Sequence, residues 1–560
     1  MNAATALKRL RSLRNQFGEA AQRELRALLR AMPTLRMRKW REVAALHDDL
    51  LFLCAFPASV AMRRDARRLL QSIAQRMAAL PSRERQRGDD TGIAGSVTRH
   101  VLPFAVARSL APTQQAEIDW RNVADETDLD AVVRPLLAPA AAEAFDSGEY
   151  GTREFVALAR PAHARSDLQW LTSEPGVADD WDSAEVPIVW QLGNSPECVT
   201  HNVVPNVPLV VRHDLRRPEA DVRAQIETPL ASIELLPRKR ASQVIGCARS
   251  ALAARCREVN AMTYPNRDEV WWCDLDCGVA LAVIGIARQH RLALETNTGY
   301  VVFAGGVPIG YGGVTPLFRQ ANTGINVFDP FRGSEAAFLW VQMLRAFHTL
   351  YGSERFVINA YQFGAGNVEA IRSGAFWFYY RLGFRPASSA VRALAAREAK
   401  RIAADRRYRS DATTLRSLAS GDLHLDLARF DPADQFDETL LPRAGARAAR
   451  QLAAAAPSRR AAQRKVGNAL ADVLGVTDYA RWTRDERRGF EFLAPIFAKL
   501  PDADTWSASD REALASLLRA KGLPQERAFA LRSTRATRAW KSLGQALTCT
   551  SSRDRGTPGA

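Results

Sequence analysis

An adjacent pair of glycines near the middle of the chain constrains the fold more than any other feature. Gly305 and Gly306 lie between two β-type runs, residues 300–304 and 307–314. Tight hairpin turns of types I′ and II′ need positive φ angles, which glycine adopts at little cost, so the sequence predicts a β-hairpin here. Pro308 has no N–H to donate and therefore predicts an edge position or a bulge at the start of the second strand.

Strand and helix patterns alternate on both sides of this hairpin. Such an order predicts an α/β (α+β) fold, with a mixed sheet covered by helices. The elements that we predict around the hairpin are a helix over 238–262, β-type runs over 270–286, a short strand over 322–328, a helix over 332–351, a strand over 356–361 and a helix that ends at Leu382.

The chain has 560 residues, more than one core usually holds, and so predicts several domains. Residues 97–237 are mixed in pattern: they could complete the following domain or form the degenerate first half of a tandem arrangement. The domains that we predict are a basic helical region (1–82), a mixed α/β region (97–237), an α/β domain (238–390), a second basic helical region (391–548) and a disordered tail (549–560).

Positive charge is concentrated at the two ends of the chain. The formal net charge is +16; residues 1–90 carry +10 and residues 385–560 carry +12, which leaves −6 for the segment between them. Basic flanks could attract nucleic acid or an anionic membrane, or they are simply solvated helix faces. The sequence has no RNP-type aromatic motif, zinc finger or glycine-bearing helix-turn-helix pattern, so no motif supports nucleic acid as a partner.

Seven scattered cysteines show no disulfide framework, which fits a reducing cytoplasm. Cys273 and Cys277 have a metal-like spacing, but no second pair or nearby histidine completes a four-ligand set, and we expect no metal. No apolar run approaches the ~20 residues that cross a bilayer. The N-terminal residues lack the apolar stretch of a secretory signal. The sequence thus predicts a cytoplasmic protein without a membrane span.

The sequence YYRLGF, residues 379–384, gives the first indication of a reaction class. It resembles the Y-x-K-L-G-F end of the last helix in the GNAT superfamily of N-acetyltransferases. The order of elements over residues 294–386 is also similar to the core of that family. The resemblance implies a GNAT-like domain at 238–390 that transfers an acyl group, acetyl above all, from acetyl-CoA or another acyl-CoA to an amine by direct attack.

The resemblance also implies where acyl-CoA would bind. In the family, a central strand splays from its neighbour, and the pantetheine arm pairs with its backbone; here that strand is 324–328. A loop at the next helix N-terminus then holds the pyrophosphate with backbone N–H groups. The cofactor-binding residues implied in this way are Ile325, Val327, Arg332, Gly333, Ser334, Ala336 and Asn367.

Two of these assignments have ordinary structural alternatives. The family loop reads Q/R-x-x-G-x-G/A, and Glu335 occupies the place of its central glycine, so we expect this carboxylate to repel a pyrophosphate. The alternative is a plain helix start, with Asp329 as N-cap, Pro330 at the first position and Glu335 in the first turns. Asn367 could likewise be an N-cap only.

For catalysis, the resemblance assigns Tyr379 as the general acid that protonates the departing thiolate. Its alternative is a core position within the aromatic run 376–380, with Tyr380 as the next candidate. We expect the general base at Glu295, just before the hairpin, with Asp329 and Glu369 as competitors. A histidine on the apolar face of a helix, His348, is expected to be a core residue.

The sequence leaves other functions open. One is a catalytically inactive GNAT-like module whose basic helical flanks contact protein or nucleic acid. Another is a tandem transferase that acts on an aminoacyl or peptidoglycan-type substrate. The amine acceptor and the oligomeric state are not specified by any residue pattern.

Overall fold

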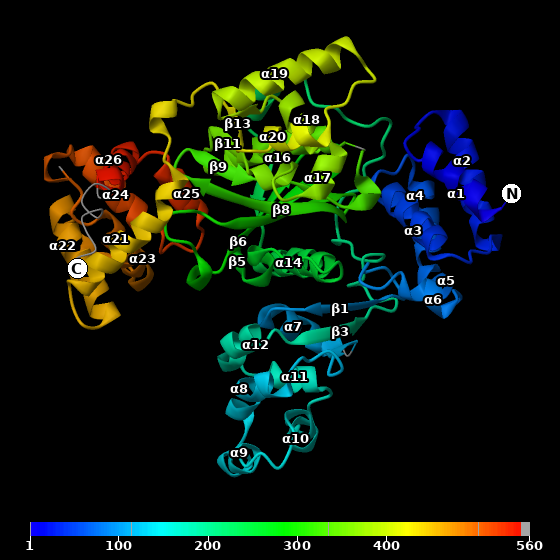
Figure 1. The fold of residues 1–560 in the computed structure, drawn as a ribbon, viewed down its shortest axis with the longest axis horizontal. Coiled ribbons are helices and arrows are strands. Elements are labelled where there is room, and N and C mark those ends of the chain that lie inside the picture. Colours follow the sequence, from blue (N-terminus) through cyan, green and yellow to red (C-terminus); the bar gives the residue numbers. More distant parts are fainter. Residues whose placement is uncertain (1, 114, 334, 502, 550–560) are drawn as a thin grey trace.

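The computed structural model describes residues 2–113, 115–333, 335–501 and 503–549. Three groups of helices surround a large central sheet, with the N-terminal helices and the C-terminal helices on opposite sides of it (Figure 1). About half of the structure is helical, 54%, and 12% is in strands, which confirms the mixed α+β fold class. None of the helices in the described parts of the chain is both long and apolar enough to span a membrane.

The central sheet has ten strands in the order β12-β13-β11-β9-β8-β7-β6-β5-β4, with β10 also paired to β8. Its middle strands read as continuous apolar runs because both faces of the sheet are covered. The strands are β4 Ile233–Leu235, β5 Pro265–Asp274, β6 Val279–Ile286, β7 Thr298–Ala304, β8 Val307–Leu317, β9 Gln320–Thr323, β10 Asn326–Val327, β11 Arg355–Ile358, β12 Arg385–Pro386 and β13 Leu423–Asp426.

The predicted hairpin is β7 and β8, which pair antiparallel. Gly305 and Gly306 form the turn with φ angles of 53° and 83°. The register shifts where Val302 faces Gly310 and Phe303 faces Pro308, so the strand that contains the proline has a bulge. Both parts of the prediction are confirmed.

The predicted strand 322–328 is interrupted. β9 ends at Thr323, and β10 covers Asn326 and Val327. β9 pairs parallel with β11 through Asn322 and Val357, whereas β10 pairs with β8 alone in the described sheet. After Ile358, the chain that forms β11 continues into the 3-10 helix η8, Ala360–Phe363. The chain segments that follow β9 and β11 therefore separate beyond this point.

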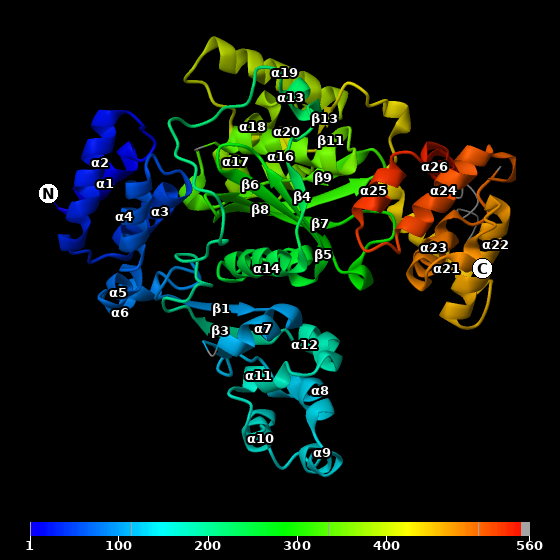
Figure 2. The same ribbon diagram turned by 180° about the vertical axis from the view of Figure 1, so that it is seen from behind.

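Helices cover both sides of this sheet. Helix α14 lies on one side, and α16, α17 and α18 lie on the other (Figures 1 and 2). The predicted helix 238–262 is shorter than expected, because the chain leaves it near Cys256, whose φ is +53°. The predicted helix 332–351 begins only at Ala336. The helices of this part are α13 Val222–Glu227, α14 Arg238–Ala253, α15 Asn260–Thr263, α16 Ala336–Tyr351, α17 Val368–Ser373 and α18 Ala375–Arg381.

The region 1–82 is helical as predicted, and its helices share one apolar core with the sheet. Residues 97–191 form a small lobe around the antiparallel sheet β1-β3-β2. Neither of its two ladders is parallel, and the tandem arrangement stays a prediction. These elements are α1 Ala3–Leu13, α2 Glu19–Ala31, α3 Trp40–Ala55, α4 Val60–Leu70, α5 Ile73–Ala78, α6 Ser82–Gln86, β1 Val97–Val101, α7 Phe104–Leu110, β2 Ala116–Ile118, α8 Asp130–Val133, α9 Pro139–Asp146, α10 Thr152–Ala159, α11 Asp167–Leu171, α12 Ala178–Ala184 and β3 Pro187–Gln191.

The C-terminal helices have a second apolar core, which includes Leu294 and Leu317 from the sheet region. The sheet itself extends beyond residue 390, because β13 lies between β11 and β12. The tail expected at 549–560 lies outside the described residues except for Cys549. The helices of this part are α19 Ser389–Ala404, α20 Ala412–Leu418, α21 Leu441–Ala453, α22 Arg459–Leu474, α23 Arg484–Phe497, α24 Ala508–Ala520, α25 Arg527–Ser533 and α26 Thr537–Cys549.

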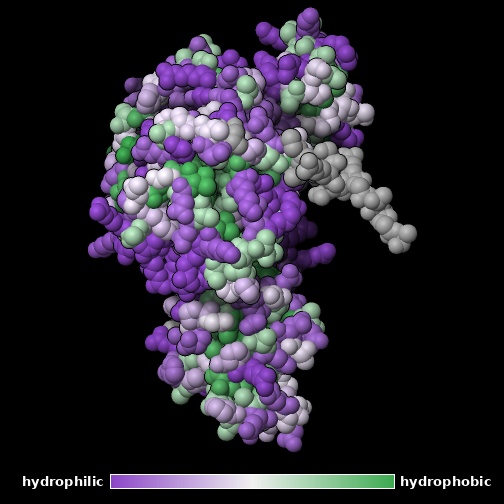
Figure 3. Space-filling model, turned by 90° about the vertical axis from the view of Figure 1, so that its left-hand side faces the viewer, coloured by the Kyte–Doolittle hydropathy of each residue, from purple (hydrophilic) through white to green (hydrophobic). Residues whose placement is uncertain are grey.

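Seen from the side, the small lobe stands out from the main body as a narrower projection (Figure 3). This side of the molecule is mostly hydrophilic, and hydrophobic residues occur on it in small separate patches. The described surface in this view therefore has the character of an ordinary solvated face.

Candidate functional site

A cavity of about 680 Å³ lies between β10 and the 3-10 helix η8 that follows β11. Its walls come from segments that are far apart in the sequence: helix α3, the loops near residues 90 and 199, the chain after α14, the end of β10, and the start of α17. Small-molecule sites usually have volumes of ~300–1,000 Å³, so this cavity is large enough for one. Among the residues that line it are Trp40, His47, Asp48, Asp90, Arg255, Arg257, Tyr311, Asn326, Val327, Asp329, Arg332, Tyr361, Gln362, Asn367 and Glu369.

Tyr379 lies where the strand is interrupted between β9 and β10. Its side chain is 4% exposed, and the Ile325 N–H donates to its hydroxyl. A second phenol, Tyr300, donates to the Gly324 carbonyl from the other side of the break. Burial raises the pKa of Tyr379 well above its usual range. The phenol therefore stays protonated, the state in which it could donate a proton.

Tyr379 also has the packing expected of a core residue. Its ring makes edge contacts with Trp340 and Phe363, with ring centroids 5.6 and 6.3 Å away. It is not among the residues that line the cavity. Gln362, which does line it, packs over Gly324: a Cβ on that glycine would be 2.8 Å from the Gln362 side chain. Tyr380 is half-buried and stacks on Phe376.

Arg332, which the resemblance implies as an acyl-CoA-binding residue, already makes contacts within the protein. The Arg332 side chain is 58% exposed and pairs with Asp329 at 3.0 Å and with Glu369 at 2.8 Å. Its Nε also donates to the Val327 carbonyl at 3.2 Å. Arg332 thus ties the end of β10 to the start of α17.

The residues just before and at the start of α16 differ in how much space surrounds them. Gly333 has a φ of +77° and no heavy atom within 4 Å of the position of a Cβ. Ala336 is the first residue of α16 and is half-buried. Ser334 lies outside the described residues.

The expectation that Glu335 repels a pyrophosphate is wrong. Glu335 is 1% exposed, and its carboxylate is directed inward, where it accepts hydrogen bonds from the Arg212 guanidinium and from the Arg216 N–H. Arg212 also donates to the Cys277 carbonyl at 2.7 Å. The carboxylate is therefore neutralised by a segment that is more than 100 residues away in the sequence, which local pattern analysis could not foresee.

Asn367 has the structural role that we considered as the alternative. Its side chain accepts from the Ala370 N–H at 3.1 Å and caps α17. It also lines the cavity, so the two roles do not exclude each other. The helix that follows is broken at Gly374, whose φ is +65°.

The structure does not bring Glu295 together with Tyr379. Glu295 lies before β7, where Thr296 donates to Pro316 near the β8–β9 turn. Burial, and next the nearby Glu438 carboxylate, raise the pKa of Glu295, and Lys521 opposes this. Tyr379 meets the chain beyond the other end of β9. Glu295 therefore faces the C-terminal helices rather than the cavity.

His47 and Asp48 of α3 are site residues that the sequence reasoning missed. His47 is 1% exposed and lines the cavity; its Nδ1 is 3.1 Å from the Asp48 carboxylate, and its Nε2 has no hydrogen-bond partner. An imidazole oriented by a carboxylate with its second nitrogen free is the arrangement of a general base. The signal in the sequence was a His-Asp pair within an apolar helix. The His348 Nδ1–H donates to the Ser353 carbonyl at 2.8 Å, which is a structural contact.

The cavity contains charges of both signs. Arg255 lies over the Phe328 ring at 3.8 Å, and burial lowers its pKa to about 10, which leaves it a cation at neutral pH. Arg257 is exposed beside it. Asp48 and Asp90 line the same space. Such a lining suits a ligand that has both a cationic and an anionic group.

Within the described residues, no group of three or more His, Cys, Asp or Glu side chains is placed to hold a metal ion. No family model matches the chain, and no curated protein and no solved structure matches it either.

Proposed function

We propose that the protein is an acyl-CoA-dependent N-acyltransferase that passes an acyl group, most simply acetyl, to an amine by direct attack. One observation carries the proposal: the parallel pair β9–β11 ends at Asn322 and Val357, and the buried Tyr379 phenol meets the backbone at Ile325, just beyond this end. The YYRLGF sequence that resembles the GNAT superfamily supplies this tyrosine, and a cavity large enough for a ligand adjoins the break.

The residues around the interruption between β9 and β10 would have separate roles in the reaction. Tyr379, which is protonated at neutral pH, would donate its proton to the departing thiolate. His47 is the better placed base, because it lines the cavity with an unpartnered Nε2, whereas Glu295 faces away. The carboxylates of Asp48 and Asp90 would favour a cationic amine, and Arg255 and Arg257 an anionic group.

A catalytically inactive binding module is the second candidate, and a specific observation favours it. Two backbone groups of the strand implied to pair with a pantetheine arm, the Ile325 N–H and the Val327 carbonyl, already have partners in Tyr379 and Arg332. A bound acyl-CoA would have to replace at least one of these contacts, which lowers its affinity.

Calorimetric titration of the full chain with acetyl-CoA and with free CoA distinguishes the acyltransferase from the inactive binding module. We expect micromolar binding that Arg332→Glu abolishes and that Arg459→Glu, the same charge change on exposed surface of α22, leaves intact. In protein that binds acetyl-CoA, Tyr379→Phe should then lower turnover of an amine acceptor by about 10²-fold at unchanged acetyl-CoA affinity. No binding of either nucleotide would reject the transferase and leave the binding module.

A further inference from the structure

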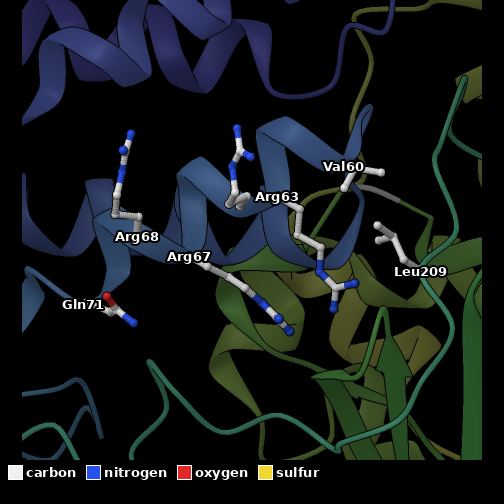
Figure 4. A pocket seen from close by; sticks show the side chains of 7 residues that line it. Val60, Arg63, Arg67, Arg68, Gln71 and Leu209 are labelled. Atoms are coloured by element: carbon white, nitrogen blue, oxygen red, sulfur yellow. The ribbon is translucent and has the colours of Figure 1, made fainter.

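A second cavity, of about 410 Å³, lies against helix α4 on the N-terminal side of the molecule (Figure 4). Four arginines of α4 line it, together with two apolar side chains and one amide, and none of its lining residues is acidic. In Figure 4, Arg63 and Arg67 extend to the same side of α4, and Arg68 extends to the other. The lining residues are Val60, Arg63, Arg64, Arg67, Arg68, Gln71 and Leu209.

Arg63 is the buried member of this group, with 8% of its surface exposed. One of its terminal nitrogens donates to the Gly305 carbonyl in the β7–β8 turn at 2.5 Å, but its Nε is buried and has no hydrogen-bond partner. The guanidinium is therefore fixed in place by the sheet, and its buried Nε is a donor without a partner.

Positive charge in this stretch is only partly compensated. Arg67 lies one turn after Arg63, and like charges at this spacing repel each other. Burial first, and the neighbouring Arg67 second, lower the pKa of Arg63. The ion pair formed here joins Arg68 to Asp65 at 3.4 Å, with the Arg68 side chain 71% exposed. An anion in the cavity would relieve this repulsion.

We propose that this cavity binds the phosphate groups of a small phosphorylated ligand. Guanidinium groups recognise phosphate oxygens with paired, charge-assisted hydrogen bonds, and two of them on one helix turn suit two linked phosphates. The volume falls in the range of small-molecule sites. The inference does not depend on the acyltransferase proposal, because the two cavities share no lining residue.

Isothermal titration of the full chain with inorganic pyrophosphate at low salt tests the proposal. We expect Arg67→Glu, an exposed position that need not disturb folding, to weaken binding by at least about tenfold. Arg36→Glu makes the same charge change outside the cavity, in the loop before α3, and should leave the affinity within about twofold. Equal weakening by both variants, or no binding by the unaltered chain, would overturn the site.

A competition arm distinguishes the source of the phosphate. A single-stranded oligonucleotide should fail to displace pyrophosphate at equal phosphate concentration, because a cavity of this size holds only a few phosphate groups. Oligonucleotide binding that is tighter than pyrophosphate binding and equally sensitive to Arg67→Glu would instead identify a nucleic-acid surface and refute the small ligand.

Discussion

Glu335 shows how a single side chain can be misjudged from its place in a motif. Its carboxylate occupies a position where the resemblance expects glycine, yet it is fully withdrawn from solvent and bound to Arg212. The same burial makes it a structural residue, because each charge of a buried pair depends on the other.

We therefore predict that Glu335→Ala lowers the free energy of unfolding by about 3–5 kcal/mol, the typical cost of leaving one charge of a buried pair unpaired. Glu369→Ala is the matched control: that carboxylate also pairs with an arginine, but its side chain is 74% exposed, and we expect about 0–1 kcal/mol. Urea unfolding followed by circular dichroism measures both. Similar losses in the two variants would contradict the burial argument.

At the scale of elements, the β7–β8 turn and helix α14 use glycine for opposite reasons. Gly306 needs its positive φ of 83°, and a Cβ there would be 2.8 Å from the Val204 carbonyl oxygen. Gly246 lies inside α14, where it is exposed and a Cβ would meet nothing within 4 Å. One glycine is required by the backbone, and the other only loosens its helix.

The same substitution should consequently change stability in opposite directions. Gly306→Ala is expected to lower the free energy of unfolding by about 1–3 kcal/mol, since strain and a close contact add up. Gly246→Ala is expected to raise it by about 0.5–1 kcal/mol through helix propensity. Thermal unfolding of the two variants beside the parent checks both signs, and a stabilised Gly306→Ala would disprove the turn geometry.

These elements also show what the sequence could and could not predict. The hairpin and its bulge follow from Gly305, Gly306 and Pro308, because turn chemistry is local. The break between β9 and β10 was missed, because it arises where Tyr300 and Tyr379 bond the backbone from distant segments. His47 was missed for a similar reason. Its helix has the apolar pattern of a core helix, and only the tertiary fold brings His47 to the same cavity as Arg255 and Asn367.

At the scale of the whole molecule, buried charges join the sheet to the C-terminal helices. The Glu269 carboxylate of β5 accepts from the Glu526 and Arg527 N–H groups, at 2.8 and 2.7 Å, at the start of α25. Arg291 donates to the Lys521 and Leu523 carbonyls beside it. This contact lies where α25 contributes to both apolar cores, with Ala530 in one and Phe529 in the other.

The stability of this junction should depend on pH. Burial raises the pKa of Glu269 to about 7, from about 4.3 in an unfolded chain. Between these values the folded protein holds a proton that the unfolded chain has released, so the free energy of unfolding should fall as pH rises, by about 4 kcal/mol at most. Denaturation from pH 4.5 to 7 should show this slope in the parent and a flatter one in Glu269→Gln. Parallel slopes would refute the assignment.

The position of β13 between β11 and β12 determines when this protein can complete its sheet during synthesis. The 36 residues from 387 to 422 separate β12 from β13, and neither β12 nor the outer edge of β11 has its partner strand until Asp426 has left the ribosome. At ~5–20 residues per second, this leaves an unpaired strand edge for several seconds. A nascent chain that stops before β13 would present that edge to other chains, so translation speed through 387–426 should decide how much of the protein aggregates.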